Sequence, residues 1–448
     1  MDTIFAPITN INRAGVLIIR ISGIKTIEVI QKIAPNLTPI HQKVSFAKIR
    51  RPENLEILDE SLISFFKAPN SFTGEDVAEI SIHASKYILK ELSGILLSID
   101  GVRQAEAGEF SKRAFLNNKI DLIQAESIPD LIAAETKLQH RQAASQLEGG
   151  LGKIYDDWLS RILSNLALIE AAIDFPEDDL PEDIIDNVEK SVSKIASEIS
   201  LHLNDNRVGQ KIKDGLDMVI IGPPNSGKSS LINLLTKSEA AIVSEVAGTT
   251  RDYIERELII ADFLVRVTDT AGLRDSDDKI EMEGVKRAEN KAKMADLKIF
   301  MIDANAQSLD DKYLEYIDNN TIILLNKIDN ASVKPNPAMI NALKSHSGQI
   351  IKLSIKHNQN IDQLFNQITS KIEAMIPSQN NSNLITQERY RKSLSQALES
   401  LDYFDLSGPI ELAGENLRIA ISCFNQINGQ VNIENILDEI FFKFCVGK

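Results

Sequence analysis

The chain has few of the residues that support disulfide or structural-metal chemistry. Its 448 residues include two cysteines, Cys423 and Cys445, and six histidines. Neither cysteine stands in a metal-binding spacing with a second cysteine or histidine, and two cysteines make no disulfide framework. The composition therefore argues against a disulfide-stabilised secreted domain and against a zinc-binding module.

Long hydrophobic runs are also missing. The longest apolar stretches, "GVLIIRI" at 15–21 and "TIILL" at 321–325, are well short of the roughly 20 residues that span a bilayer. The first ten residues, "MDTIFAPITN", lack the basic segment and following apolar segment of a secretory signal. We therefore expect a cytoplasmic protein that does not use a membrane.

Positive charge is scarce as well. The 49 Lys and Arg residues are outnumbered by 64 Asp and Glu residues, which gives a formal net charge of -15 at pH 7. Non-specific binding to phosphate backbones depends on clustered Lys and Arg side chains. If a nucleic acid is the substrate, a partner protein is expected to supply much of the binding to it.

The length predicts two or three domains, because one hydrophobic core does not serve so long a chain. Residues 1–118 are predicted to form a mixed α/β unit, with strands in "GVLIIRIS" and "SLISFFKA". Residues 119–212 have helical periodicity. In residues 213–377 short apolar runs alternate with helices, which indicates a mostly parallel sheet. Residues 378–448 are helical again, so a nucleotide domain is inserted between the two parts of a helical domain.

A phosphate-binding motif opens the inserted domain. The stretch "GPPNSGKS" at 222–229 fits G-x-x-x-x-G-K-[ST] and lies between the apolar run "LDMVII" and a helix, which is the context this motif requires. Lys228 is expected to neutralise the β and γ oxygens, and the Ser229 hydroxyl to bind Mg²⁺. The nucleotide contacts predicted here are Asn225, Ser226, Gly227, Lys228, Ser229 and Ser230.

Base identity is predicted from "NKID" at 326–329. A carboxylate at Asp329 can accept from both N1-H and the exocyclic amino group of guanine, whereas adenine offers no such pair of donors. Together with the phosphate-binding motif, Asn326, Lys327 and Asp329 predict GTP as the nucleotide. Ser354 in "LSIK" stands where related domains carry a second base-contacting loop.

Two further segments complete the predicted GTP site. In "GTTRD" at 248–252, Thr250 is expected to ligand Mg²⁺, although a threonine pair can also serve as a helix cap or turn. The segment "DTAG" at 269–272 is expected to sense the terminal phosphate, with Asp269 as an outer-sphere Mg²⁺ carboxylate and the Gly272 N–H on the γ-phosphate. The remaining predicted contacts are Thr249, Thr270 and Ala271.

The residue after this segment, Leu273, cannot orient a water, unlike the glutamine found there in Ras-like GTPases. The amide oxygen of Asn225 is one substitute, because it could hold a monovalent cation beside the β and γ phosphates. Simple loop geometry is the alternative role for that residue. A carboxylate on the following segment is a second substitute, and the sequence leaves five candidates open: Asp275, Asp277, Asp278, Glu281 and Glu283.

The whole chain resembles the MnmE family of tRNA-modification GTPases, also called TrmE. The most specific pieces are "NSFTGEDVAEI" at 70–80, "GEFSKRAFLNNKIDLIQAE" at 108–126, "GPPNSGKSSLIN" at 222–233, "GTTRD", "DTAGLR" and the terminal "FCVGK". The resemblance implies a homodimer that works with the FAD-dependent protein MnmG, as a heterotetramer, to add a (carboxymethyl)aminomethyl group at carbon 5 of the wobble uridine in certain tRNAs.

The resemblance also assigns residues in the GTP site. It implies hydrolysis that depends on potassium and on facing G domains, with Glu281 as the water-orienting carboxylate. The loop "SEVAGTT" at 244–250 would cover the potassium ion. The implied potassium ligands are Asn225, Ser244, Val246 and Thr249.

A folate site is implied in the N-terminal unit, where the family binds a tetrahydrofolate derivative, in its 5,10-methylene form, that donates one carbon. The matching positions are Arg20, Glu79, Lys119 and the terminal Lys448. Charged side chains suit the folate glutamate tail or the pterin. The sequence departs from the family pattern at "PITNINRAG" (7–15) and "IHAS" (82–85), which puts the shape of the folate pocket in question.

Cys445 lies four residues from the end, in "CVGK". The segment does not fit a prenylation box. One interpretation is a small apolar residue at the end of a helix. The family pattern Cys-Ile-Gly-Lys instead implies a role in the modification chemistry.

Two rival functions remain open at this point. A ribosome-assembly GTPase of the Era or EngA type would be a binding switch, but such proteins carry an RNA-binding appendage or a second G domain, and the sequence contains neither a basic tail nor a second phosphate-binding motif. A folate-dependent aminomethyltransferase with a regulatory G domain is the other rival.

Overall fold

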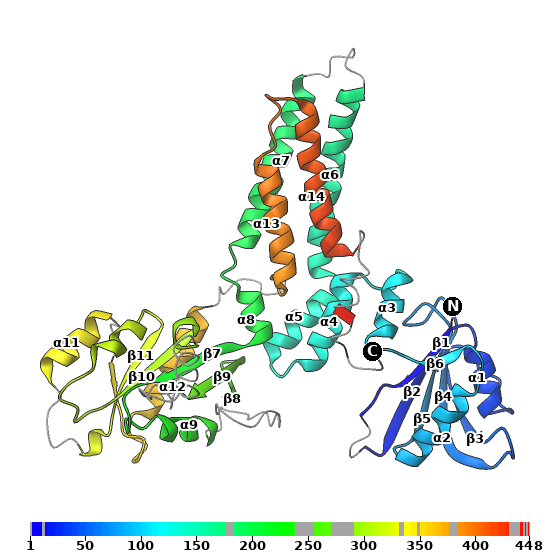
Figure 1. Ribbon diagram of the computed structural model, residues 1–448, viewed down its shortest axis with the longest axis horizontal. Coiled ribbons are helices and arrows are strands. Elements are labelled where there is room, and N and C mark those ends of the chain that lie inside the picture. The colour runs from blue at the N-terminus through cyan, green and yellow to red at the C-terminus, as the bar shows by residue number, and fades with distance from the viewer. Residues whose placement is uncertain are drawn as a thin grey trace, which may run out of the picture. The chain divides into compact units, whose positions relative to one another are not determined.

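The computed structural model describes residues 2–10, 14–174, 182–237, 255–269, 291–330, 336–346, 350–375 and 383–429, and residues 440, 441, 444 and 447. The chain divides into two compact units. The first contains residues 1–132, 146–199 and 392–448, and the second contains residues 133–145 and 200–391. Each unit has a six-stranded sheet (Figure 1). The four-segment domain division predicted from the sequence stays a prediction.

The first unit begins with a sheet in the order β3-β4-β5-β2-β1-β6. Neighbouring strands pair antiparallel except β1 and β6, which are parallel. The predicted strands in "GVLIIRIS" and "SLISFFKA" are confirmed as β2 and β4. The strands are β1 (Thr3–Pro7), β2 (Val16–Ser22), β3 (Lys43–Arg50), β4 (Ile57–Phe66), β5 (Val77–His83) and β6 (Val102–Gln104).

The two faces of this sheet are packed against different helices. Helices α1 (Thr26–Ile33) and α2 (Lys86–Leu97) pack on one face, where residues such as Ile19, Ile30 and Leu92 form a common core. On the opposite face, α3 (Glu109–Leu116) places the buried Phe110 against Ile4 and Ala6 of β1. Because successive side chains of a strand alternate between the two faces, β2 contributes Ile19 to the core and Arg20 to the other face.

The helical part of the first unit is built from α4 (Leu122–Ala133), α6 (Gly150–Asp174), α7 (Glu182–Leu203), α13 (Glu388–Asp402) and α14 (Ile410–Asn428). Buried residues of α6 recur three and four apart, as expected for a helix with one buried face. Trp158 of α6 lies 6.2 Å, between ring centroids, from Phe424 of α14. The helical periodicity predicted after residue 120 is thus resolved into separate helices.

The second unit contains a sheet in the order β12-β11-β10-β7-β9-β8. Only β8 is antiparallel to its neighbour. The predicted mostly parallel sheet is therefore confirmed, and each of its strands coincides with an apolar run in the sequence. The strands are β7 (Leu216–Ile221), β8 (Glu255–Ile260), β9 (Phe263–Asp269), β10 (Leu297–Asp303), β11 (Thr321–Asn326) and β12 (Ile350–Lys352).

Helices bury both faces of this sheet. One face packs against α8 (Val208–Asp214), α9 (Lys228–Lys237) and α12 (Ile361–Ala374). The other packs against α11 (Pro337–His346) and the 3₁₀ helix η1 (Asp311–Tyr316). Central strands buried on both sides are apolar throughout rather than alternating, which is why β10 and β11 read as continuous hydrophobic runs. Helix α5 (Lys137–Leu147) and the short η2 (Ile328–Asn330) also belong to this unit.

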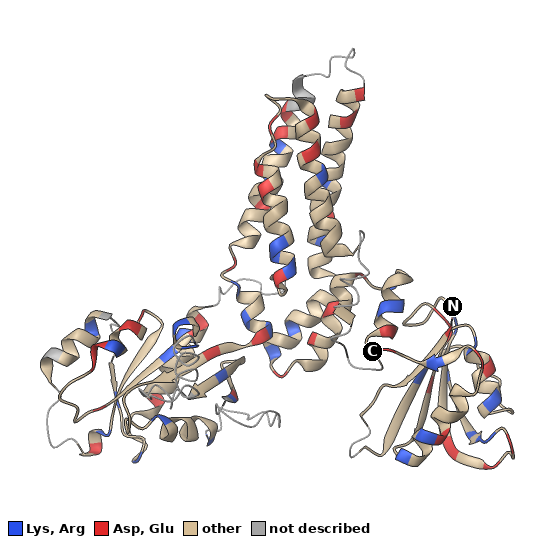
Figure 2. Ribbon diagram, in the orientation of Figure 1, with Lys and Arg blue, Asp and Glu red and all other residues tan. Residues whose placement is uncertain are grey.

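Acidic and basic residues are interspersed along the helices and strand ends, as Figure 2 shows. The negative net charge is thus not confined to one segment of the described chain. Among the described residues, no helix is long and apolar enough to cross a membrane.

Candidate functional sites

The phosphate-binding loop joins β7 to α9 at the carboxyl edge of the second sheet. Two glycines are required by close packing in this loop. A Cβ at Gly222 would lie 2.1 Å from the Met301 carbonyl oxygen, and one at Gly227 would lie 2.3 Å from Nδ2 of Asn326. Both have positive φ, as does Asn225 at 61°. The loop therefore turns back on the strand ends and leaves Asn225, Ser229 and Ser230 exposed.

Lys228, the first residue of α9, folds over this loop. Its Nζ donates to the carbonyl oxygens of Gly222, at 2.8 Å, and Pro223, at 3.0 Å. The ammonium group is thus held against the backbone of the loop. This position suits the phosphate contact predicted from the sequence.

The NKID segment is tied directly to the phosphate loop. Asn326 is buried, and its Nδ2 donates to the Ser226 carbonyl oxygen at 2.9 Å. Lys327 donates from Nζ to the Asn225 carbonyl oxygen at 2.7 Å and to Asp303 Oδ2 at 2.8 Å. Two of the predicted guanine-contacting residues therefore also support the loop that is predicted to hold the phosphates.

Asp303 was not predicted from the sequence to belong to this site. Burial opposes ionisation of its carboxyl group, but hydrogen bonds from Lys327 and Asn305 outweigh that effect and lower its pKa. Asp303 therefore stays charged and anchors Lys327. Its place in the apolar run "LKIFMID", at the end of the strand beside the NKID strand, is the signal that could have identified it.

Asp329 is fixed by residues of the LSIK segment. A hydrogen bond from the fully buried Ser354 lowers the pKa of Asp329. His357 Nε2 lies 3.5 Å from Asp329 Oδ2, and the Ile355 N–H donates to Asn326 Oδ1 at 3.3 Å. Ser354 thus favours the ionised form of the carboxylate that the sequence predicts to contact guanine. His357 is a second neighbour that sequence reasoning missed.

Several predicted GTP-site residues lie outside the described residues. Asp269 ends β9 opposite Ile220 of β7, which places its backbone at the same edge as the phosphate loop. The structure describes neither the Asp269 side chain nor the following residues, 270–290. The other calls outside the described residues are Ser244, Val246, Thr249, Thr250, Thr270, Ala271, Gly272, Glu281, Cys445 and Lys448.

A second polar site lies on the first sheet, at the paired residues Arg20 of β2 and Glu79 of β5. Arg20 donates to Glu79 Oε1 from Nε, at 3.0 Å, and from Nη2, at 2.7 Å. The guanidinium carbon lies 5.3 Å from the ring centroid of Phe72 and 5.7 Å from that of Phe110. Aromatic faces attract a guanidinium at such distances, so the rings help to fix its orientation.

Of the other residues predicted for this second site, Lys448 lies outside the described residues, and Lys119 makes no hydrogen bond or ion pair to Arg20 or Glu79 among them. Lys119 donates from Nζ to the Pro69 carbonyl oxygen at 2.9 Å, at the start of the loop that carries Phe72. The C-terminal segment reaches the same sheet, because a Cβ at the buried Gly447 would lie 2.3 Å from the Pro7 carbonyl oxygen. Sequence reasoning missed Phe72 and Phe110, although both occur in the motif segments that carry the family resemblance.

The contacts around the phosphate loop, at the carboxyl edge of a mostly parallel sheet, define a P-loop guanine-nucleotide-binding protein. Comparison with known proteins narrows this class to one family. A model of the MnmE helical domain matches residues 122–445, and a model of the GTP-binding protein TrmE N-terminus matches residues 3–119. The chain therefore belongs to the family of the tRNA modification GTPase MnmE.

Full-length relatives agree with these matches. The tRNA modification GTPases MnmE of Rickettsia typhi and of Rickettsia prowazekii are each 45% identical to this chain over 451 residues, and the alignments cover 100% of both chains. Among solved structures, Aquifex aeolicus Era bound to GDP·AlF4⁻ is similar to this chain with a TM-score of 0.29 and 24% identity, covering 41% of this chain and 66% of that one.

Proposed function

We propose that the protein is the GTP-hydrolysing component of a tRNA-modification reaction. The observation that carries this proposal is the direct bonding of Asn326 and Lys327 to the phosphate loop, which joins the predicted base-contacting segment to the predicted phosphate-binding segment. The names of its full-length relatives, tRNA modification GTPases, supply the biological setting. Mg²⁺ would be held by Ser229 and Thr250, with Asp269 in its outer shell.

The reaction that we propose takes place on the wobble uridine of certain tRNAs, in the cytoplasm. With the FAD-dependent partner MnmG, in a heterotetramer, the protein adds a (carboxymethyl)aminomethyl group at carbon 5. A tetrahydrofolate derivative in the 5,10-methylene form supplies one carbon, and the flavin supplies the redox chemistry. The residues of this chain bind GTP and the folate and hold the reacting groups in register.

Potassium is the proposed cation of the GTP site. Asn225 is exposed, which supports a role as a ligand rather than a packing role. We propose Ser244, Val246 and Thr249 as the other ligands. The ion would place positive charge beside the β and γ phosphates, where charge develops in the transition state.

This proposal predicts a strong dependence on the monovalent cation. GTP hydrolysis by the full-length protein should be faster in potassium chloride than in sodium chloride at equal ionic strength, because the smaller ion fits the same ligands less well. Steady-state phosphate release measures the rate, and Asn225→Ala should remove most of the difference. Equal rates in the two salts would exclude potassium from the transition state.

The Arg20–Glu79 pair supports the proposed folate site. Both hydrogen bonds of the pair end on Glu79 Oε1, so Arg20 Nη1 remains as a donor and Glu79 Oε2 as an acceptor for a ligand. The pterin ring offers the complementary acceptor and donors along one edge. The phenyl ring of Phe72 is 36% exposed and could stack on a planar ligand. We propose Lys119 and Lys448 as contacts to the folate carboxylates.

The exposed face of the first sheet supports the proposed homodimer. Phe46 and Leu62 lie opposite each other on β3 and β4 and are 62% and 50% exposed. Val44 on the same face is 58% exposed. Such adjacent apolar side chains are uncommon on a surface that faces only water. We propose that this face is covered by a second copy of the chain, beside the Arg20–Glu79 pair.

Cys445 is proposed to act at the modification centre. Gly447, two residues further on, packs on β1, the strand that pairs with the Arg20 strand. Cys445→Ser removes the thiol but nearly preserves its size. We expect this variant to hydrolyse GTP at a normal rate and to leave the wobble uridine unmodified. Mass spectrometry of digested tRNA measures the product, and full modification would indicate that Cys445 has only a packing role.

The same assay in a deletion strain tests the whole proposal. Loss of the modified wobble uridine, restored by the wild-type gene but not by Cys445→Ser, is the expected result. Normally modified tRNA in the deletion strain would favour a ribosome-assembly GTPase instead. Restoration by a variant unable to hydrolyse GTP would favour an aminomethyltransferase with a regulatory G domain.

A further inference from the structure

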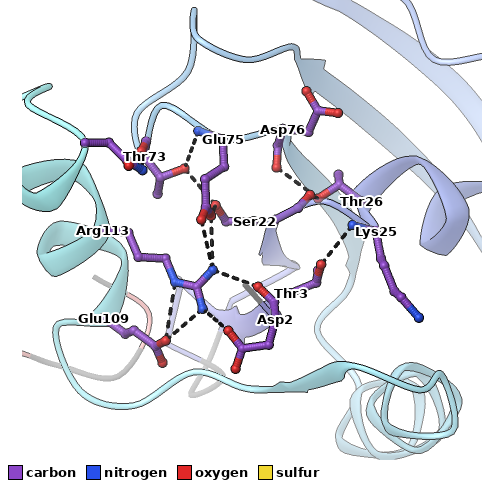
Figure 3. A network of polar contacts seen from close by, with 12 residues as sticks. Asp2, Thr3, Ser22, Lys25, Thr26, Thr73, Glu75, Asp76, Glu109 and Arg113 are labelled. Atoms are coloured by element: carbon purple, nitrogen blue, oxygen red, sulfur yellow. Dashed lines mark hydrogen bonds and ion pairs between the residues drawn. The ribbon is translucent and has the colours of Figure 1, made fainter.

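A network of charged and polar side chains connects α3 to the loop between β4 and β5, and Figure 3 shows it from close by. The loop consists of residues 67–76 and carries Phe72, whose ring contacts Arg20. The centre of the network is Arg113 on α3. Among the described residues Arg113 makes no hydrogen bond to Arg20. It bonds instead to Glu75, which lies in the same loop as Phe72.

Arg113 is 11% exposed and makes hydrogen bonds to three acidic residues. Its Nη1 donates to both carboxylate oxygens of Glu75, at 3.1 and 3.2 Å, and to the Asp2 carbonyl oxygen at 2.9 Å. Its Nη2 donates to Asp2 Oδ1 at 2.7 Å and to Glu109 Oε1 at 3.0 Å. The side chains of Arg113, Glu75 and Glu109 are largely buried, whereas that of Asp2 is 40% exposed. All four are paired, so removal of one partner of a buried ion pair leaves another charge without compensation.

Glu75 carries the connection into the sheet. Its Oε2 accepts from the Ser22 hydroxyl at 2.6 Å, and the Ser22 and Thr73 hydroxyls are 2.7 Å apart. Ser22 is two residues from Arg20 on β2, so the two side chains share one face of the sheet. The network therefore ends immediately beside the guanidinium group of the proposed ligand site.

The loop is held at other points by backbone contacts. Asn117 Nδ2 donates to the Thr73 carbonyl oxygen at 2.7 Å, and Lys119 holds the Pro69 carbonyl oxygen. Gly74 has a φ of 78°, and a Cβ there would lie 3.1 Å from Cβ of Asn117. Phe72 thus projects from a loop whose neighbouring residues are anchored to α3 and to the segment that follows it.

We propose that Arg113 is a positioning residue for the Arg20–Glu79 site. Through Glu75 it fixes the loop and holds the Phe72 ring against Arg20, and so sets the affinity of the site for a reduced folate. This inference rests on the proposed folate-binding function. A site that is ordered before binding does not have to order its loop when the ligand arrives. Loosening the loop should therefore weaken binding even though no ligand contact is removed.

Arg103 provides a matched control. Its side chain bonds to Asp2 and to Glu109, with Nη1 2.8 Å from Glu109 Oε2, and it makes no contact with Glu75 among the described residues. Arg103→Lys and Arg113→Lys therefore disturb the same acidic partners with the same chemical change. Only the second also disturbs the connection to the loop.

The test measures binding of 5-formyltetrahydrofolate to the full-length protein by calorimetry. We expect Glu75→Gln and Arg113→Lys to weaken binding about tenfold, which corresponds to about 1.4 kcal/mol, and Arg103→Lys to change it by less than about twofold. Amide hydrogen exchange should rise in residues 70–76 of the first two variants and stay unchanged in β2 and α1. A purely structural role would increase exchange across the whole sheet.

The outcomes separate this inference from the folate proposal on which it rests. Arg20→Met should abolish binding. If it does, and Glu75→Gln binds as tightly as the wild type, the positioning role is wrong and the folate site stands. If the wild type does not bind the folate, or Arg20→Met binds normally, both are wrong. Loss of binding accompanied by exchange throughout the sheet would also overturn the positioning role.

Discussion

Asp329→Asn should lower the affinity for GTP by about 10-fold to 150-fold. A hydrogen bond to a charged acceptor contributes roughly 1.5 to 3 kcal/mol, which corresponds to this range. The hydrogen bond from Ser354 lowers the pKa of Asp329, so the wild-type side chain is fully ionised near neutral pH. In the variant an amide donor would face the guanine donors.

The same variant should shift the preference toward xanthosine triphosphate. Xanthine carries an oxygen in place of the guanine amino group, and the new amide can donate to it. Titration calorimetry with both nucleotides measures the exchange of preference. Asp311→Asn, at an exposed position on η1 of the same unit, is the control and should bind GTP normally. Unchanged GTP affinity in Asp329→Asn would show that this carboxylate does not read the base.

Glu281→Ala should slow GTP hydrolysis by about 100-fold or more while leaving GTP binding nearly intact. Leu273 cannot orient a water, and we propose that Glu281 does so instead. Removal of a group that acts on the transition state typically costs a factor of this size. A group that acts mainly in the transition state changes the turnover rate and not the ground-state affinity. Single-turnover hydrolysis at saturating GTP in potassium chloride measures the effect.

Neighbouring carboxylates are the controls for Glu281. Asp277→Ala and Asp278→Ala alter charge on the same segment and should hydrolyse GTP within a few-fold of the wild-type rate. If either of these variants is slow and Glu281→Ala is not, the water-orienting residue has been assigned to the wrong position. Titration of a non-hydrolysable GTP analogue into each variant separates a loss of binding from a loss of turnover.

The fold of the second unit follows closely from its sequence. Strands buried on both faces must be apolar throughout, so β10 and β11 are visible as uninterrupted hydrophobic runs between helical segments. The phosphate loop is equally visible in the sequence. Glycine is required at Gly222 and Gly227, because a Cβ at either position would clash with Met301 or Asn326. The sequence motif and the tertiary packing therefore both require glycine at these positions.

Other parts of the sites depend on residues that are far apart in the sequence. Arg20 and Glu79 are 59 residues apart and meet only because β2 and β5 pair in one register. A shift of one residue would turn either side chain to the opposite face. The sequence alone identified both residues through the family resemblance, but not their ion pair or the aromatic rings beside Arg20.

The sequence by itself determined the nucleotide class of this protein, because a phosphate loop and an NKID segment are each contiguous and carry their chemistry within a few residues. Only the tertiary structure decided that Asn326 and Lys327 support the phosphate loop and that Arg113 holds the loop of Phe72. The physical reason is that a hydrogen bond requires two groups within about 3 Å. Segments separated by tens of residues reach that distance only after the strands and helices have packed.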